Sequence, residues 1–302
     1  MKKDLLSVYD LDRDDVRVIL EHAVTLKELQ RERKTHIPLK GKALGMIFDK
    51  SSTRTRISFE VGMYQLGGIA LFLNGRDTQL GRGESVSDTA RIISRYLDGI
   101  MIRTYSQELV EEFAQYATIP VINGLTDLEH PCQILSDLFT IMEKKGRYTG
   151  MKVAYIGDGN NIANSWINAA ARLPFHLTLA CPQGYEPNQE LIQRGMKESE
   201  SGIDVYRDPI DAVRDADVVY TDVWTSMGQE TEQEERKKIF MNYQINTMLL
   251  SYARKDAIVM HCLPAHRGEE ITAEVIDGPQ SVVIDQAENR LHVQKAIMEI
   301  LL

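Results

Sequence analysis

Short apolar segments rich in β-branched residues alternate with helical patterns along the chain, and this alternation limits the possible folds more than any other feature. In the first half, the candidate strands are residues 43–48, 69–73, 99–102 and 119–122. The candidate helices between them span about 53–66, 84–96 and 107–116. Strands that alternate with helices predict a parallel sheet with helices on its faces. We therefore expect an α/β fold.

The alternation is interrupted by a polar, glycine-flanked segment, residues 144–150, and then restarts. The further candidate strands are residues 153–156, 176–180, 217–221, 257–261 and 281–284. Because 302 residues exceed the usual size of one domain, we predict two domains, 1–146 and 147–286, each a parallel sheet flanked by helices. A last helix, 287–302, carries an apolar face, and we expect it to pack back on the first domain.

Charge and cysteine content argue against several classes of protein. The formal net charge is −9, and an acidic surface repels phosphate backbones and anionic lipids, so neither nucleic acid nor a membrane is expected as the main partner. No stretch approaches the ~18 apolar residues that span a bilayer, and the start of the chain does not resemble a signal peptide. The cysteines, Cys132, Cys181 and Cys262, are few and odd in number, which fits unpaired thiols in a reducing compartment. We predict a cytoplasmic protein.

Directly after the strand at 43–48, a helix is predicted to begin with Ser52, Thr53, Arg54, Thr55 and Arg56. Hydroxyl residues are good N-caps, but arginines are unusual there, because a helix N-terminus disfavours a cation by roughly 0.3–1 kcal/mol. Backbone N–H groups, hydroxyls and guanidinium groups together make a strong oxyanion site. This segment therefore predicts the binding site of a small phosphorylated anion.

A purely structural explanation of this segment is that Asp49 and Glu60 neutralise the two arginines, although that leaves the cluster of hydroxyls unexplained. Arg290 presents a related oddity, since it is predicted to lie in the first turn of the last helix. There the alternative is a local ion pair with Glu288 or Asp285.

Two further clusters follow predicted strands. His130 precedes a helix whose first turn suits Pro131, and it can donate a hydrogen bond to a carbonyl oxygen, with Gln133 nearby. A hydrogen-bonded structural histidine is the alternative. Asp222 offers a carboxylate to an ammonium group, and a polar run that begins at Gly228 has the composition of a mobile lid. For that run, the alternative is an ordinary surface loop.

The loop at residues 157–161 lacks the third glycine of the dinucleotide-binding fingerprint, because Ile162 takes its place, so dinucleotide binding is weakly supported. One of its two asparagines is expected to cap the next helix, and the other could reach a ligand. Cys262 and His266 are the only near neighbours with a metal-ligand spacing in the last cluster, and no metal is predicted there.

Four motifs together resemble the ornithine carbamoyltransferases: Ser-Thr-Arg-Thr-Arg at 52–56, His-Pro-Cys-Gln at 130–133, Asp-x-x-x-Ser-Met-Gly at 222–228 and His-Cys-Leu-Pro at 261–264. The resemblance covers essentially the whole chain, without a departure at a motif position. The first two motifs are similar to those of the wider aspartate/ornithine carbamoyltransferase superfamily, and the last two to those of its ornithine branch. It implies carbamoyl transfer from carbamoyl phosphate to the δ-amine of L-ornithine, giving L-citrulline and phosphate, with no metal or organic cofactor.

The resemblance also implies a site, residue by residue. Carbamoyl phosphate would be bound by Ser52, Thr53, Arg54, Thr55, Gln79, Arg103, His130, Gln133, Cys262, Leu263 and Arg290. Those expected to act in catalysis are Arg54, Arg103, His130, Cys262 and Arg290. Ornithine would be bound by Asn161, Asp222, Ser226 and Met227. Gln79 would reach in from a neighbouring subunit of a homotrimer, or of a multiple of trimers, with sites between subunits.

Three alternatives remain at this point. A sister transferase could carbamoylate putrescine or an acylated ornithine, although an acidic residue at Asp222 suits a free α-amino acid. A nucleotide-dependent oxidoreductase would use the same kind of sheet, but the missing third glycine counts against it. A non-catalytic anion sensor with the enzyme's fold is disfavoured by the intact motifs.

Overall fold

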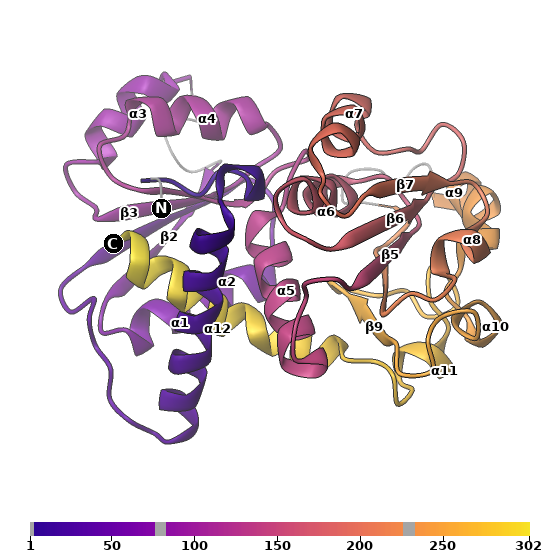
Figure 1. The fold of residues 1–302 in the computed structure, drawn as a ribbon. Helices are drawn as coiled ribbons and strands as arrows, with labels where there is room; N and C mark the ends of the chain where they lie inside the picture. The colour runs from indigo at the N-terminus through magenta and orange to yellow at the C-terminus, as the bar shows by residue number, and fades with distance from the viewer. Residues whose placement is uncertain (1–2, 76–82, 226–232) are drawn as a thin grey trace. The chain divides into compact units, whose positions relative to one another are not determined.

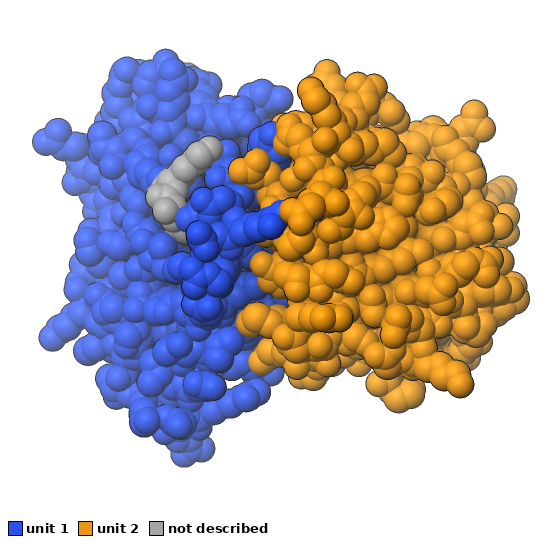
Figure 2. All heavy atoms as spheres, viewed as in Figure 1, with its two compact units in different colours: residues 1–139, 288–302 blue, residues 140–287 orange. Residues whose placement is uncertain are grey.

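The computed structural model describes residues 3–75, 83–225 and 233–302. Its contacts divide the chain into two compact units: unit 1 comprises Met1–Phe139 and Glu288–Leu302, and unit 2 comprises Thr140–Ala287 (Figure 2). Each unit contains its own parallel sheet with helices around it, as the alternating sequence pattern predicts (Figure 1). Within the described ranges, no helix is both long and apolar enough to cross a membrane.

The sheet of unit 1 has the strand order β2-β1-β3-β4, and all its pairs are parallel. Its strands are β1 (Ala43–Phe48), β2 (Ile69–Asn74), β3 (Gly99–Arg103) and β4 (Val121–Leu125). The helices of this half are α1 (Arg13–Arg31), α2 (Thr53–Gln65), α3 (Val86–Ile93), α4 (Gln107–Tyr116) and the start of α5 (Pro131–Lys145). The central strands are apolar and buried along almost their whole length, as expected of parallel strands that are covered on both faces.

The sheet of unit 2 has the order β7-β6-β5-β8-β9, again entirely parallel. Its strands are β5 (Lys152–Ile156), β6 (His176–Ala180), β7 (Ile203–Tyr206), β8 (Val218–Thr221) and β9 (Ile258–His261). Its helices are α6 (Asn161–Arg172), α7 (Gln189–Glu198), α8 (Pro209–Val213), α9 (Gln233–Phe240), α10 (Thr247–Leu250) and α11 (Ala273–Ile276).

Two strand assignments differ from the sequence prediction. Strand β7 was not predicted, because it has four residues, lies at the edge of its sheet and includes Asp204. The predicted strand at 281–284 is wrong: Ser281 makes only an isolated bridge to Val259, and the helix α12 (Val283–Leu301) follows at once. The backbone N–H of Gln286 already donates to the carbonyl of Val282 in this helix, 2.9 Å away.

The C-terminal helix packs on α1 and α2 inside unit 1, as predicted, although it begins earlier than residue 287 (Figure 1). The ammonium group of Lys27 in α1 donates to the side-chain oxygen of Asn289 at 2.6 Å, in a buried position. In α2, a Cβ added to Gly62 would lie 2.7 Å from the terminal methyl of Met298, so a glycine is needed for this close approach.

The apolar face of α12 provides a direct test of this packing. Ile297 is fully buried, whereas Ile284 on the same helix is 75% exposed. We predict that Ile297→Ala lowers the free energy of unfolding by about 2–5 kcal/mol, because it leaves a cavity in a packed interior. Ile284→Ala is the matched control and should change it by less than about 0.5 kcal/mol. Urea unfolding measures both, and equal effects of the two changes would contradict the assigned face.

Candidate active site

The predicted anion site begins at the first turn of α2, in unit 1. Ser52 is the N-cap, and its hydroxyl accepts a hydrogen bond from the backbone N–H of Thr55 at 3.2 Å. Thr53 is exposed at the first helical position and Arg54 is half-buried. The Nε atom of Arg54 is buried and has no hydrogen-bond partner among the residues that the structure describes. Hydroxyls, backbone N–H groups and a guanidinium group therefore lie at one helix end.

The two arginines of this turn differ in their surroundings. Arg56 donates to Glu60 at 2.9 Å and lies over the ring of Phe72, with 3.9 Å between the guanidinium carbon and the ring centroid. For Arg56, the structural explanation is therefore correct. Asp49 instead accepts from the hydroxyl of Thr104 at 2.6 Å. Of the two arginines, Arg54 is the one whose position agrees with an anion site.

Arg290 lies beside this turn, but not for the reason predicted. Because α12 begins at Val283, Arg290 lies past the first turn, and a conflict with the helix dipole does not arise. Arg290 is buried, and its guanidinium group donates to the hydroxyl of Thr55 at 2.6 Å. The alternative was a local ion pair with Glu288 or Asp285, and the carboxylate of Glu288 lies 3.4 Å from Nε2 of His292.

His130 lies in the same half of the site, directly before α5, and is buried. Burial holds the pKa of His130 well below its usual value, and the positive charges of Arg290 and Arg103 lower this pKa further. Arg103 is itself buried and ends strand β3. Near neutral pH the imidazole of His130 is therefore uncharged, so it can donate one hydrogen bond from one ring nitrogen.

Gln133 is buried in the first turn of α5, and its amide nitrogen donates to the carboxylate of Asp137 at 2.8 Å. The amide oxygen of Gln133 is buried without a hydrogen-bond partner in the described part of the chain. Asp137 was not singled out from the sequence, although the spacing of four residues on one helix face was the available signal. Cys132, by contrast, donates to the carbonyl of Asn123 at 3.5 Å, and burial raises the pKa of its thiol to about 12.

Asp222, which is predicted to bind ornithine, belongs to unit 2, directly follows β8 and is buried. Its carboxylate accepts hydrogen bonds from the amide of Asn160 at 2.8 Å and from the backbone N–H of Val223 at 2.8 Å. The thiol of Cys262 donates to it at 2.9 Å. Three groups therefore orient one carboxylate.

The two asparagines of the 157–161 loop have different roles, and one of them caps the next helix, as expected. Asn160 is the N-cap of α6, and its side-chain oxygen accepts from the N–H groups of Ile162 and Ala163. Asn161 is the first residue of α6 and is partly exposed. Gln79, Ser226 and Met227, which the sequence also predicts as site residues, lie outside the described residues.

A metal ion would find a poor set of ligands at the end of β9. Ligand atoms of Asp222, His261 and Cys262 lie within 4.8 Å of one another, and His266, Glu269 and Glu270 form a second such group. However, Nδ1 of His261 accepts a hydrogen bond from the backbone N–H of Leu263 at 2.8 Å, and Nε2 lies 3.0 Å from Glu270. A metal bound by His261 would have to break one of these two contacts.

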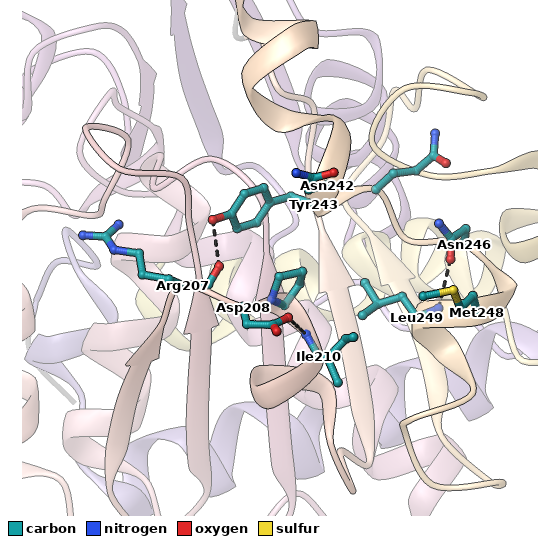
Figure 3. Close-up of a pocket in the computed structure, with 10 residues that line it drawn as sticks. Arg207, Asp208, Ile210, Asn242, Tyr243, Asn246, Met248 and Leu249 are labelled. Atoms are coloured by element: carbon teal, nitrogen blue, oxygen red, sulfur yellow. Dashed lines mark hydrogen bonds between the residues drawn. The ribbon is translucent and has the colours of Figure 1, made fainter.

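A separate surface pocket of about 400 Å³ lies in unit 2, and no predicted site residue lines it (Figure 3). Its polar groups are engaged in local structure. Asp208 caps α8, Asn246 caps α10, and the hydroxyl of Tyr243 donates to the carbonyl of Arg207 at 2.8 Å. A ligand site needs polar groups that converge on the cavity, and these groups point into the protein's own backbone instead.

Two family models match successive parts of the chain. The model of the carbamoyl-phosphate-binding domain of aspartate/ornithine carbamoyltransferases matches residues 3–143. The model of the Asp/Orn-binding domain of the same proteins matches residues 149–301.

Individual relatives match the chain over its whole length. An ornithine carbamoyltransferase of Syntrophus aciditrophicus is 72% identical over 302 residues, which is 100% of both chains. The solved structure of the Pyrococcus furiosus ornithine carbamoyltransferase has a TM-score of 0.94 and 54% identity, covering 98% of this chain and 95% of that one. That of Burkholderia thailandensis has a TM-score of 0.92 and 49% identity, covering 100% and 99%. The chain therefore belongs to the aspartate/ornithine carbamoyltransferase family.

Proposed function

We propose that this chain transfers the carbamoyl group of carbamoyl phosphate to the δ-amine of L-ornithine, forming L-citrulline and phosphate. The observation that carries this proposal is the anion site at the start of α2, where the buried Nε of Arg54 lies beside hydroxyls and free N–H groups. The similarity to ornithine carbamoyltransferases over both domains supports the choice of substrates.

Carbamoyl phosphate binds with its phosphate at the first turn of α2, held by Ser52, Thr53, Arg54 and Thr55. The partial positive charge of the helix end and the guanidinium group of Arg54 both favour an anion there. Arg103 and Arg290 add positive charge from β3 and α12. Gln79, which lies outside the described residues, remains a prediction from the family resemblance.

The carbamoyl group lies between donors and one acceptor of the same unit. Its carbonyl oxygen gains negative charge as the amine attacks, and the uncharged imidazole of His130 and the guanidinium group of Arg290 donate to it. The buried amide oxygen of Gln133 accepts from the carbamoyl NH₂ group, because Asp137 holds the other end of the Gln133 amide. This role gives the buried amide oxygen of Gln133 a ligand partner.

Ornithine binds in unit 2, with its α-ammonium group on Asp222. A carboxylate has about four lone-pair sites, and Asn160, Val223 and Cys262 use three of them, which leaves one for the ammonium group. Asn161, Ser226 and Met227 are proposed from the family resemblance to complete the ornithine site. Cys262 and Leu263 are placed next to the reacting amine on the same ground.

In the reaction, the neutral δ-amine forms a bond to the carbamoyl carbon, and the bond from that carbon to the bridging phosphate oxygen breaks. The amine loses one proton, and the leaving phosphate is a base that can take it. The protein therefore needs to orient the two substrates and stabilise the charge on the carbonyl oxygen, without a separate protein base.

We also propose a homotrimer, as the family resemblance implies. The edge strand β2 and the neighbouring helix α2 expose a large apolar surface, to which Tyr64, Ile69, Leu71 and Phe72 contribute. An exposed apolar edge strand normally marks an interface. We predict that Tyr64→Lys, at a site 79% exposed, shifts the sedimenting species from trimer to monomer. A wild-type monomer at micromolar concentration would contradict the proposed assembly.

Arg54 and Arg56 form a matched pair that tests the anion site. We predict that Arg54→Ala lowers kcat/KM for carbamoyl phosphate by about 100-fold to 1,000-fold, because one preorganised donor is lost. Arg56→Ala should change it by only a few-fold, since Arg56 is engaged with Glu60 and Phe72. Steady-state citrulline assays measure both. Equal losses, with both variants folded by circular dichroism, would contradict the role of Arg54.

The role of Asp222 predicts a selective defect. Asp222→Ala should raise KM for ornithine about 10-fold to 100-fold, because a charge-assisted hydrogen bond is worth roughly 1.5–3 kcal/mol. The affinity for inorganic phosphate, measured by calorimetry, should stay unchanged, because the residues proposed to hold phosphate in the first turn of α2 belong to unit 1. Loss of phosphate binding in this variant would show that Asp222 acts on the fold rather than on ornithine.

The neutral state of His130 predicts a dependence of stability on pH. In the unfolded chain His130 takes up a proton as the pH falls below about 6.5, whereas its lowered pKa keeps it uncharged in the folded chain. The unfolded state then binds more protons, so folding stability falls with decreasing pH, by up to about 1.4 kcal/mol per pH unit from this one group. In His130→Gln this contribution is absent. Urea unfolding between pH 5 and 7 should show the smaller slope in the variant, and identical slopes would contradict a buried neutral imidazole.

A further inference from the structure

A buried chain of hydrogen bonds in unit 2 ends on the backbone of Leu263. His261, the last residue of β9, is buried, and its Nδ1 accepts from the backbone N–H of Leu263 at 2.8 Å. Its Nε2 lies 3.0 Å from a carboxylate oxygen of Glu270. Because Nδ1 acts as an acceptor, the proton of the neutral ring resides on Nε2 and is donated to Glu270.

Glu270 is fully buried, which is costly for a carboxylate. The oxygen that accepts from His261 also accepts from the backbone N–H of His266 at 2.6 Å. The other oxygen of Glu270 is buried and has no hydrogen-bond partner within residues 3–75, 83–225 and 233–302. Replacing such a buried pair by apolar side chains is often neutral or stabilising, so stability alone does not explain this arrangement.

The segment that this pair holds is strained and lies at the candidate site. Leu263 has a φ of 57°, in the left-handed region, where a residue with a Cβ costs about 1–2 kcal/mol. Such a conformation persists where the surroundings enforce it, and it is common at functional sites. The preceding residue, Cys262, donates its thiol to Asp222 at 2.9 Å. Holding the backbone of Leu263 therefore also fixes the direction of the Cys262 side chain.

The backbone of His261 is anchored as well. Its N–H donates to the side-chain oxygen of Gln286 at 2.9 Å, and the amide nitrogen of Gln286 donates to the hydroxyl of Tyr220 at 3.2 Å. These contacts are buried and fix the position of the His261 imidazole.

We infer that His261 and Glu270 are positioning residues for carbamoyl transfer. Glu270 fixes the tautomer and orientation of His261, and His261 holds the backbone N–H of Leu263, so that Leu263 and Cys262 are preorganised for the reacting groups. This inference rests on the proposed function. Neither residue touches a substrate in this account, and both act through the segment 262–263.

The test uses two replacements of His261, one that keeps an acceptor for the backbone N–H of Leu263 and one that removes it. In His261→Asn, the side-chain oxygen occupies the place of Nδ1 and can still accept from the N–H of Leu263, as in an Asx turn. In His261→Phe, a ring of similar size remains but the acceptor is lost. We predict that His261→Phe lowers kcat by about 100-fold, which is the loss expected when a reacting group is misplaced by about 1 Å. The kcat of His261→Asn should be at least about 10-fold higher than that of His261→Phe.

His176→Phe is a matched control, because His176 also pairs with a carboxylate in unit 2, that of Asp204 at 2.8 Å, but makes no contact with the site residues described above. It should keep the wild-type kcat. Binding of inorganic phosphate should be unchanged in all three variants, which separates a positioning effect from loss of the fold. Thermal unfolding of each variant completes the comparison.

An assay that does not require turnover follows the thiol of Cys262. Cys132 and Cys181 are buried, so a thiol reagent added to the folded wild-type protein reports on Cys262. His261→Phe should speed its reaction, since release from Asp222 increases access, whereas His261→Asn should react at the wild-type rate. Equal kcat in His261→Phe and wild type, or no rescue by Asn at equal thermal stability, would overturn the inference. Absence of citrulline in assays of the wild type would instead overturn the proposed function. The thiol assay would still report on the contact between His261 and Leu263.

Discussion

The proposed anion site depends on positive charge that is buried in unit 1. Arg103 and Arg290 are buried beside His130 in a chain whose net charge is −9. Burial lowers the pKa of His130, and the positive charges of Arg290 and Arg103 lower it further. The positive charge of these two guanidinium groups favours an anion, and in the proposed function that anion is carbamoyl phosphate.

The same buried positive charge favours an uncharged imidazole at His130 in the proposed site. A charged histidine would add one more cation to the region, whereas a neutral one donates a single directed hydrogen bond. Arg290 reaches this region because α12 packs on α1 and α2, with Lys27, Asn289 and Gly62 at the contacts. The C-terminal helix therefore has a structural role and, through Arg290 and Thr55, a role in the proposed site.

Much of the fold and of the candidate site could be predicted from the sequence. Apolar β-branched segments located eight of the nine strands in the described part of the chain, because buried parallel strands leave a strong pattern. The edge strand β7 was missed since it is short and half-exposed, and residues 281–284 were misassigned because β-branched residues also begin α12. Family motifs predicted Arg54, His130 and Asp222. Asp137 was missed although its spacing of four residues from Gln133 was an available signal. The partner role of Glu270 could not be predicted, because it depends on which side chain Glu270 meets in space.

The two arginines of α2 illustrate the limit of an argument from charge alone. In the sequence, Arg54 and Arg56 are equivalent violations of the helix dipole. In the structure, Glu60 and Phe72 account for Arg56, and only the environment of Arg54 agrees with an anion site. The interpretation of Arg290 also changed. The sequence placed Arg290 at the start of a helix, whereas in the structure it donates to the hydroxyl of Thr55.

The most direct test of the central claim follows the carbamoyl carbon itself. Purified protein would be mixed with ¹³C-labelled carbamoyl phosphate and L-ornithine, with putrescine in a parallel sample, and the label followed by NMR. Carbamoyl transfer to ornithine predicts that the label moves to the ureido carbon of citrulline, in step with the release of phosphate, and much more slowly to putrescine. Label that appears only in bicarbonate, or that moves to putrescine faster than to ornithine, would contradict it.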